Sequence, residues 1–185
     1  GDNGTTKLFN TPSGVRVSKS SSVFEALGTI DELNSFLGIV KVYSAQSGHG
    51  VGDISFEKIV HNVQENLFIV QAELAGSEMS ITEKIVSDVE NLIANIENNL
   101  PPITTFFISG GTLLAAHFDT ARTIARRAER RVVTVHEDYS NADEGNTNKI
   151  SANTLAYLNR LSSLLYALAR YSNHLAGITE TAPKY

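Results

Sequence analysis

Apolar residues recur every three or four positions along most of this chain, and this helical period constrains the fold more than any other feature. Strands and helices do not alternate in the pattern, which disfavours a parallel sheet covered by helices. We therefore predict an all-α fold, a five-helix up-and-down bundle preceded by an irregular N-terminal arm. The five periodic stretches cover approximately residues 22–46, 56–74, 82–99, 112–135 and 151–175.

Local signals predict where these helices begin and end. Ser22 and Glu25 have the spacing of a capping box at the start of the first helix. A glycine-rich loop, 47–52, follows that helix, and the pair Pro101-Pro102 ends the third because proline cannot continue the hydrogen-bond ladder. Beyond the fourth helix, the polar and acidic stretch 137–149 indicates a mobile loop.

The remaining segments complete the predicted organisation. Residues 1–21 are rich in Gly, Thr, Ser and Asn and indicate an irregular arm with short extended pieces. Residues 103–108 are expected to be extended and lead into Ser109-Gly110-Gly111. We predict a single domain over 1–185, with the arm at 1–21 and the helical bundle at 22–176.

Composition excludes several classes of protein. The chain has 185 residues, 42% of them hydrophobic, and none of its apolar runs approaches the roughly 20 residues of a membrane span. It has no cysteine, which excludes disulfides, thiolate nucleophiles and cysteine zinc sites. The formal net charge of -5 argues against a nucleic-acid-binding protein, whose affinity depends on basic surface.

Five of the eight arginines nevertheless fall within residues 122–131, so any anion site is expected there. Arg122, Arg126 and Arg130 recur every four residues and should share one side of a helix, with Glu129 beside them. Stacked guanidinium groups repel one another unless an anion lies among them, and a triphosphate matches their forked donors. The alternative is a solvated arginine face paired with Glu129 and other surface acids. His117 falls on the apolar stripe of the same helix and is expected to be a core histidine.

Three other places offer candidate polar residues. The opening stretch 1–6 contains glycines, which let backbone amides approach an anion, and two threonine hydroxyls, although such a stretch is also typical of a flexible terminus. Lys19 is a further phosphate candidate or simply an exposed lysine. Asp31 lies in the middle of the first helix, where it is either exposed or paired with an arginine. The Asn159 amide suits adenine or phosphate, or an ordinary interhelical hydrogen bond.

Other catalytic sites lack their sequence patterns. The five histidines show no Glu-x-x-His spacing, so a di-metal carboxylate bundle has no ligand set. A Ser/His/Asp elbow, a dinucleotide fingerprint and a paired zinc motif are also missing from the sequence. The sequence therefore disfavours the hydrolases and dehydrogenases that depend on these motifs.

Taken together and in order, five segments resemble the ATP:cob(I)alamin adenosyltransferase family of the propanediol-utilisation and human mitochondrial type. The similarity spans nearly the whole chain, and its most specific part is the Arg-Arg-Ala-Glu-Arg-Arg run after the Gly-Gly turn. The segments that carry it are Gly1-Asp2-x-Gly4-Thr5-Thr6, Phe24-Glu25-Ala26-x-Gly28-Thr29-x-Asp31-Glu32-Leu33-Asn34, Phe106 to Gly111, Ala121-Arg122-Thr123-x-x-Arg126-Arg127-Ala128-Glu129-Arg130-Arg131 and Asn159-Arg160-Leu161-Ser162.

The resemblance implies a homotrimer in which ATP and cobalamin meet near subunit interfaces. It implies an Asp31–Arg122 ion pair across the interface, and it places Phe106 against the lower face of the corrin, where the ring keeps an axial ligand away from cobalt. Magnesium would be bound through ATP, with no protein ligand assigned. The residues that the resemblance assigns to ATP are Asp2, Gly4, Thr5, Thr6, Lys19, Arg126, Arg127, Glu129, Arg130 and Asn159.

The implied reaction moves the 5′-deoxyadenosyl group of ATP to cob(I)alamin and releases triphosphate. A reductase and an adenosylcobalamin-dependent acceptor enzyme are the implied protein partners, in the cytoplasm of a bacterium or in the mitochondrial matrix of a eukaryote. The alternative is a noncatalytic helical oligomerisation or regulatory module that binds nucleotide through the same arginines.

The sequence departs from the family pattern in three places. Ser109 stands where proline is common, Ser20 follows Lys19 where aspartate is usual, and Ser163 and Tyr166 replace an aspartate and a phenylalanine. The first change leaves the register of Phe106 open, because the adjacent Phe107 offers an equivalent ring.

Overall fold

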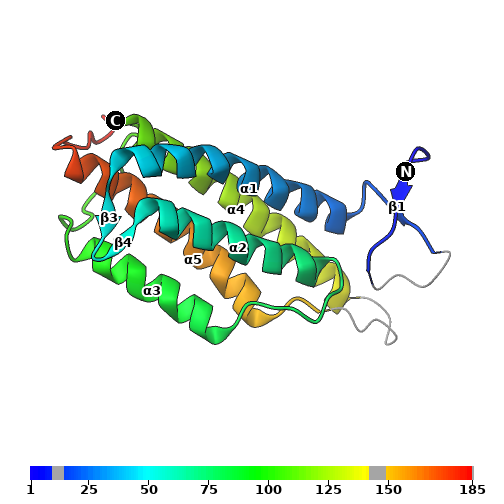
Figure 1. The fold of residues 1–185 in the computed structure, drawn as a ribbon. Helices are drawn as coiled ribbons and strands as arrows, with labels where there is room; N and C mark the ends of the chain where they lie inside the picture. Colours follow the sequence, from blue (N-terminus) through cyan, green and yellow to red (C-terminus); the bar gives the residue numbers. More distant parts are fainter. Residues whose placement is uncertain (10–14, 142–148, 185) are drawn as a thin grey trace.

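The computed structural model describes residues 1–9, 15–141 and 149–184, and five helices form its body (Figure 1). Consecutive helices run in opposite directions, so the predicted all-α up-and-down bundle is confirmed. Central α4 packs against both α1 and α5, α1 packs also against α2, and α3 packs against α5. The helices are α1 (Ser22–Ser47), α2 (Phe56–Leu74), α3 (Glu83–Glu97), α4 (Leu113–Ser140) and α5 (Ala152–Leu175).

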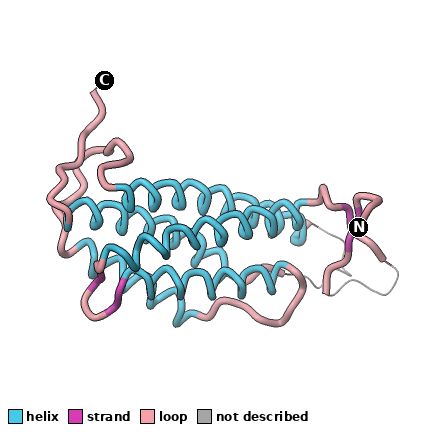
Figure 2. The backbone as a smooth tube through the Cα atoms, turned by 45° about the horizontal axis from the view of Figure 1, so that its top comes forward, coloured by secondary structure: helices cyan, strands magenta, loops and turns pink. Residues whose placement is uncertain are grey.

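Short strands occur in the described residues only at the two ends of the bundle (Figure 2). Beyond the start of α1, β1 (Thr5–Thr6) pairs antiparallel with β2 (Val17–Ser18), which agrees with the expected extended pieces of the arm. At the other end, β3 (Gly50–Val51) and β4 (Ile54–Ser55) form a hairpin that begins within the glycine-rich loop predicted at 47–52 and ends beyond it. A tight two-residue turn closes this hairpin.

Hydroxyl side chains begin four of the five helices. Ser55, Thr82, Thr112 and Ser151 each accept a hydrogen bond from a backbone N–H in the first turn of α2, α3, α4 and α5, which satisfies donors that a helix start leaves free.

The capping box predicted for α1 is wrong. Ser21, not Ser22, is the N-cap residue, and its side chain makes no capping hydrogen bond. The Ser22 hydroxyl instead donates to Asp138 near the end of α4, at 2.6 Å between Oγ and Oδ2. This contact ties the start of α1 to the last turns of α4, which extends to Ser140 and therefore five residues beyond the predicted 135. The predicted mobile loop, 137–149, therefore begins within the last turn of α4, and residues 142–148 lie outside the described residues.

The core contains one cluster of apolar side chains contributed by all five helices. On α4 the inward stripe includes four fully buried alanines, Ala115, Ala121, Ala125 and Ala128. Small side chains let neighbouring backbones approach closely, which explains how α4 can pack between two partners. The prediction that His117 is a core residue is wrong, because its side chain is only half-buried. Its Nδ1 lies 2.9 Å from the Leu113 carbonyl oxygen, and its ring centre lies 4.8 Å from that of Tyr43.

Glu73 is the buried acid that anchors the start of α5. Its carboxylate, 8% exposed, accepts a hydrogen bond from the Ser151 backbone N–H at 2.6 Å and another from the Thr154 hydroxyl. A negative charge at a helix N-terminus is stabilised by the free amides and by the helix dipole. Through this contact the last residues of α2 fix where α5 begins. In the described residues, no helix has an apolar stretch of the length that a bilayer crossing requires.

Candidate functional site

The predicted arginine stripe divides into separate environments on α4. Arg126 and Arg130 are exposed and face a surface pocket of about 270 Å³, which Glu129, Val133 and Asn159 also line. Arg130 donates from Nη1 to the Arg126 carbonyl oxygen at 3.2 Å. Neither guanidinium group forms an ion pair with a carboxylate in the described part of the chain. Two unpaired cations beside one pocket provide the forked donors that a polyphosphate requires.

The polar wall of this pocket is fixed by a chain of hydrogen bonds across three helices. Asn159 on α5 donates from Nδ2 to Glu129 Oε1 at 3.0 Å, and its Oδ1 accepts from Arg160 Nη1 at 2.9 Å. Arg160 in turn donates from Nε to Glu90 on α3 at 2.8 Å. In the described residues Glu129 forms no salt bridge with Arg126 or Arg130, which the solvated-face alternative supposed, and its Oε1 accepts from the Asn159 amide instead.

The other two arginines of the Arg-Arg-Ala-Glu-Arg-Arg run face α1. Arg127 donates from Nη2 to Glu32, and Arg131 Nη2 lies 3.9 Å from Glu25 Oε2. Both pairs are half-exposed, and such pairs contribute little to stability. The structure thus places Arg127, which was predicted to bind ATP, beside α1 and not in the lining of the arginine pocket.

Arg122 lies toward the beginning of α4 and is held within its own chain. Its Nε is 3.4 Å from Asp119 Oδ1, and its guanidinium lies 5.7 Å from the centre of the Tyr166 ring. Burial raises the pKa of the Tyr166 hydroxyl, so this ring is neutral near pH 7. Asp31 is exposed on α1, and no ion pair within the described chain includes it. The predicted Asp31–Arg122 pair stays a prediction, since it joins two subunits.

The arm projects beyond the end of the bundle at which α1 begins (Figure 1). Arg16, which the sequence analysis did not single out, donates from Nε to the Thr5 hydroxyl at 2.7 Å and from Nη2 to the Thr5 carbonyl at 2.6 Å. Lys19 N–H donates to the Gly4 carbonyl at 2.9 Å, which closes the arm on itself. Asp2 and Thr6 belong to the same end of the arm. Among the described residues, no hydrogen bond joins the stretch 1–6 to the arginine pocket.

The aromatic pair at 106–107 is divided between solvent and protein. Phe106 is 78% exposed, whereas the Phe107 ring lies 5.2 Å from the Arg170 guanidinium. The segment 103–108 is assigned to neither helix nor strand, and Phe106 is the more exposed of the two rings.

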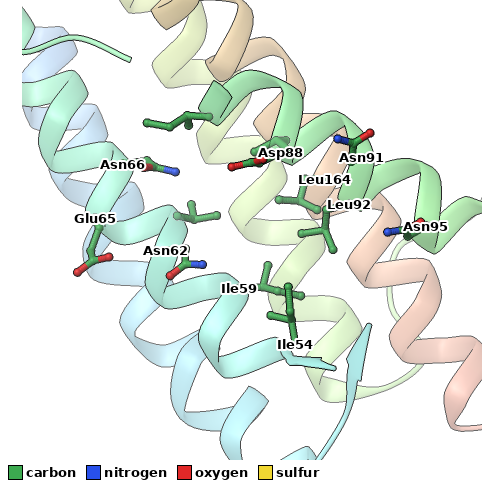
Figure 3. Close-up of a pocket in the computed structure, with 13 residues that line it drawn as sticks. Ile54, Ile59, Asn62, Glu65, Asn66, Asp88, Asn91, Leu92, Asn95 and Leu164 are labelled. Atoms are coloured by element: carbon green, nitrogen blue, oxygen red, sulfur yellow. The ribbon is translucent and has the colours of Figure 1, made fainter. Parts of the chain in front are cut away.

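A larger pocket of about 460 Å³ opens between α2 and α3, with Leu164 of α5 among the residues that line it (Figure 3). Four asparagines, Glu65 and Asp88 line it together with apolar residues, and no arginine or lysine does. The charged side chains that line this pocket are both acids, which disfavours a polyphosphate, so size alone is a poor guide to the nucleotide site. The smaller arginine pocket has the appropriate charge.

Several residues that connect these places had no recognisable pattern in the sequence. Asp119 (8% exposed) and Arg170 (4% exposed) are buried charges, and a buried charge is uncommon unless it is paired. Asp119 carries a signal in retrospect, because it lies three residues before Arg122 on the same helix. Arg170 and Asn173 carry none, since their partners come from distant segments.

Comparison with known proteins agrees with this geometry. A family model described as cobalamin adenosyltransferase matches residues 1–172. A corrinoid adenosyltransferase of Bacillus subtilis is 37% identical over 183 residues, a match that covers 96% of this chain and 86% of the relative. The corrinoid adenosyltransferase PduO of Salmonella typhimurium is 34% identical over 194 residues. This chain spans about half the length of the PduO relatives that it matches, 48% of the Citrobacter freundii protein and 52% of the Salmonella protein.

Solved structures give the same result. A variant of the PduO-type ATP:corrinoid adenosyltransferase from Lactobacillus reuteri, complexed with cobalamin and ATP, superposes with a TM-score of 0.82 at 27% identity. The match covers 100% of this chain and 97% of that one. On the family match over residues 1–172, the extended relationship to the Bacillus protein and the shared fold, this chain belongs to the cobalamin adenosyltransferase family.

Proposed function

We propose that this chain transfers the 5′-deoxyadenosyl group of ATP to cob(I)alamin, producing adenosylcobalamin and triphosphate. The observation that carries the proposal is the pocket between Arg126 and Arg130, whose guanidinium groups have no carboxylate partner in the described residues. The family relationship and the relative complexed with cobalamin and ATP support the choice of substrates.

In the proposed step, the cobalt(I) lone pair attacks the ribose C5′ atom and the C5′–O bond breaks. The bonding electrons leave with the triphosphate, so negative charge develops on the leaving oxygen. Arg126 and Arg130 both line the pocket and would stabilise that charge as cationic donors. Asn159, held by Glu129 and Arg160, would orient the nucleotide, and this accords with the value of pre-organised contacts.

Magnesium is proposed to arrive with ATP, where it would neutralise part of the phosphate charge. Among the described residues, no group of three or more histidine, aspartate or glutamate side chains is placed to hold a metal ion. The protein's own contribution to the charge balance would come from arginine.

We further propose that the enzyme is a homotrimer and that the arm of one subunit completes the site of its neighbour. The arm that carries Asp2, Gly4, Thr5, Thr6 and Lys19 lies beyond the end of its own bundle (Figure 1), which supports a role next to another chain. Arg127 would join the ATP site only if it exchanged Glu32 for phosphate.

On α1, the exposed Asp31 is accompanied by two exposed apolar side chains, Ile39 at 48% and Val42 at 55%. Apolar side chains on an outward helix face favour association.

Phe106 is proposed to lie against the lower face of the corrin and to exclude an axial ligand. Its exposure supports this choice over Phe107, which is stacked on Arg170. Loss of an axial ligand makes reduction of the cobalt easier, and a reductase and an acceptor of adenosylcobalamin are the proposed partners of the reaction.

The direct test supplies ATP, magnesium and chemically reduced cobalamin to the protein. We expect a light-sensitive cobalt–carbon bond in the visible spectrum and release of intact triphosphate. The rival, a noncatalytic nucleotide-binding helical module, predicts no loss of ATP. Release of pyrophosphate or orthophosphate alone would contradict the proposed bond cleavage.

The ion pair across the interface gives a second test. We expect Asp31→Ala and Arg122→Ala each to lower kcat/KM by about tenfold, and the double variant to lose no more than the worse single variant, since partners are non-additive. As a control, Asp88→Ala, which removes an exposed acid paired with Lys84 on α3, should combine additively with Arg122→Ala. Additive losses for Asp31 and Arg122 would disprove the pair.

A further inference from the structure

The segment 101–112 carries Phe106 without help from regular secondary structure. None of its residues before Leu113 belongs to a helix or strand, yet the proposed function needs one ring held at a defined place. The contacts that fix the segment therefore decide where the Phe106 ring lies. They converge on the last turns of α5 and on the chain that follows.

Arg170 makes the first of these contacts. Its side chain is only 4% exposed, and three partners surround the guanidinium. Nε donates to Glu180 Oε2 at 2.9 Å, Nη2 donates to the Pro101 carbonyl oxygen at 3.1 Å, and the Phe107 ring centre lies 5.2 Å away. A planar guanidinium can form forked hydrogen bonds and stack on an aromatic face at the same time, whereas an ammonium cannot.

Asn173, one turn further along α5, holds the other end of the segment. Its Nδ2 donates to the Gly110 carbonyl at 2.8 Å, and its Oδ1 accepts from the Thr112 N–H at 2.9 Å. Gly111 between them has a φ of 97°, and a Cβ there would collide with the Asn173 amide. The Gly110 N–H lies 3.3 Å from Asp119 Oδ2, so the same turn is joined to the acid that pairs with Arg122.

The chain after α5 closes the arrangement. Glu180 supplies the carboxylate for Arg170, and the neighbouring Thr181 carbonyl accepts a hydrogen bond from the Ile108 N–H at 2.8 Å. Both ends of the segment are thus fixed, while Phe106 projects from the part between them.

We propose that Arg170, through Glu180, Pro101 and Phe107, is a positioning residue that determines which of the two phenylalanines is presented to the corrin. The inference rests on the proposed function, because that function supplies the corrin. The contacts of Arg170 with Glu180, Pro101 and Phe107 are observed independently of it. With Phe107 stacked against Arg170, the adjacent Phe106 faces outward. Without that stacking, the Phe107 ring is no longer held against α5, and either phenylalanine ring can turn toward the corrin.

The test uses Phe106→Trp as a reporter, because the chain contains no tryptophan. We expect that adding Arg170→Lys, which keeps the charge but loses the planar fork, will lower the steady-state anisotropy of this tryptophan and increase its quenching by acrylamide. Glu180→Gln should act in the same direction and serves if Arg170→Lys does not fold. Glu97→Gln, an exposed acid at the end of α3, is the matched control and should leave both signals unchanged.

Activity is then measured with Phe106 restored. Arg170→Lys and Glu180→Gln are expected to lower kcat/KM for cob(I)alamin by about tenfold or more, with the Kd for ATP unchanged, since misplacement of a contacting group by about 1 Å can reduce rates by as much as about 100-fold. Unchanged anisotropy, or an equal loss in ATP affinity and corrinoid kinetics, would overturn the positioning role. A more mobile tryptophan together with a wild-type protein that transfers no adenosyl group would overturn the proposed function instead.

Discussion

Arg126→Ala is expected to lower kcat/KM for ATP by about 100-fold, which is the usual effect of removing one fixed donor from a developing negative charge. Arg126 lines the arginine pocket and forms no ion pair in the described residues, so its guanidinium is free to bind phosphate. Steady-state kinetics over a range of ATP concentrations would measure the change. Arg126→Lys, which keeps the charge but loses the fork, should recover part of the activity.

Arg131→Ala is the matched control for this prediction. Arg131 lies on the same helix, but it faces Glu25 of α1 and does not line the pocket. Its removal deletes the same side chain from a half-exposed ion pair, so we expect activity within about twofold of wild type. If both alanine variants lose activity equally, net charge and not the pocket would explain the effect, and the assignment of Arg126 would fail.

Glu73→Ala is expected to lower the free energy of unfolding by about 3 kcal/mol, because it leaves buried donors at the start of α5 without an acceptor. The Ser151 N–H and the Thr154 hydroxyl both donate to this carboxylate, and Thr154 is fully buried. Urea unfolding followed by circular dichroism would measure the change. Glu73→Gln should lose less, since the amide retains one acceptor oxygen.

Glu65→Ala provides the comparison on the same helix. Its side chain is 64% exposed, and its Oε1 lies 3.4 Å from Nε2 of the partly exposed His61, so removal should change the free energy of unfolding by no more than about 0.5 kcal/mol. Equal losses for the two alanine variants would show that the Glu73 contact does not anchor α5.

The helical bundle could be predicted from the sequence because its signals are local. The apolar period and the Pro101-Pro102 stop both act within a few residues, and the predicted helices agree with the observed ones apart from their ends. The main errors had a tertiary cause. Ser22 bonds to Asp138 across the bundle, and this contact was invisible to the capping-box pattern.

The candidate site was predictable in part for the same reason. The spacing of Arg122, Arg126 and Arg130 follows from helix geometry, but the sequence could not show that Glu32 and Glu25 take the intervening arginines. Nor could it choose between Phe106 and Phe107, because Arg170 lies more than sixty residues away along the chain. Contacts of that range depend on the packing of whole helices.

The open side of the bundle between α2 and α3 has a consequence for the native-state motions of the protein. Only Val89 and Ile96 are buried on α3, and the helix packs mainly on α5, so little apolar area opposes its detachment. Helices with the fewest buried contacts exchange their amide hydrogens first through local unfolding. In this chain, detachment of α3 would leave the contacts among α1, α4 and α5 in place but would break the Glu90–Arg160 pair, so motion of this one helix would loosen the Asn159 wall of the arginine pocket.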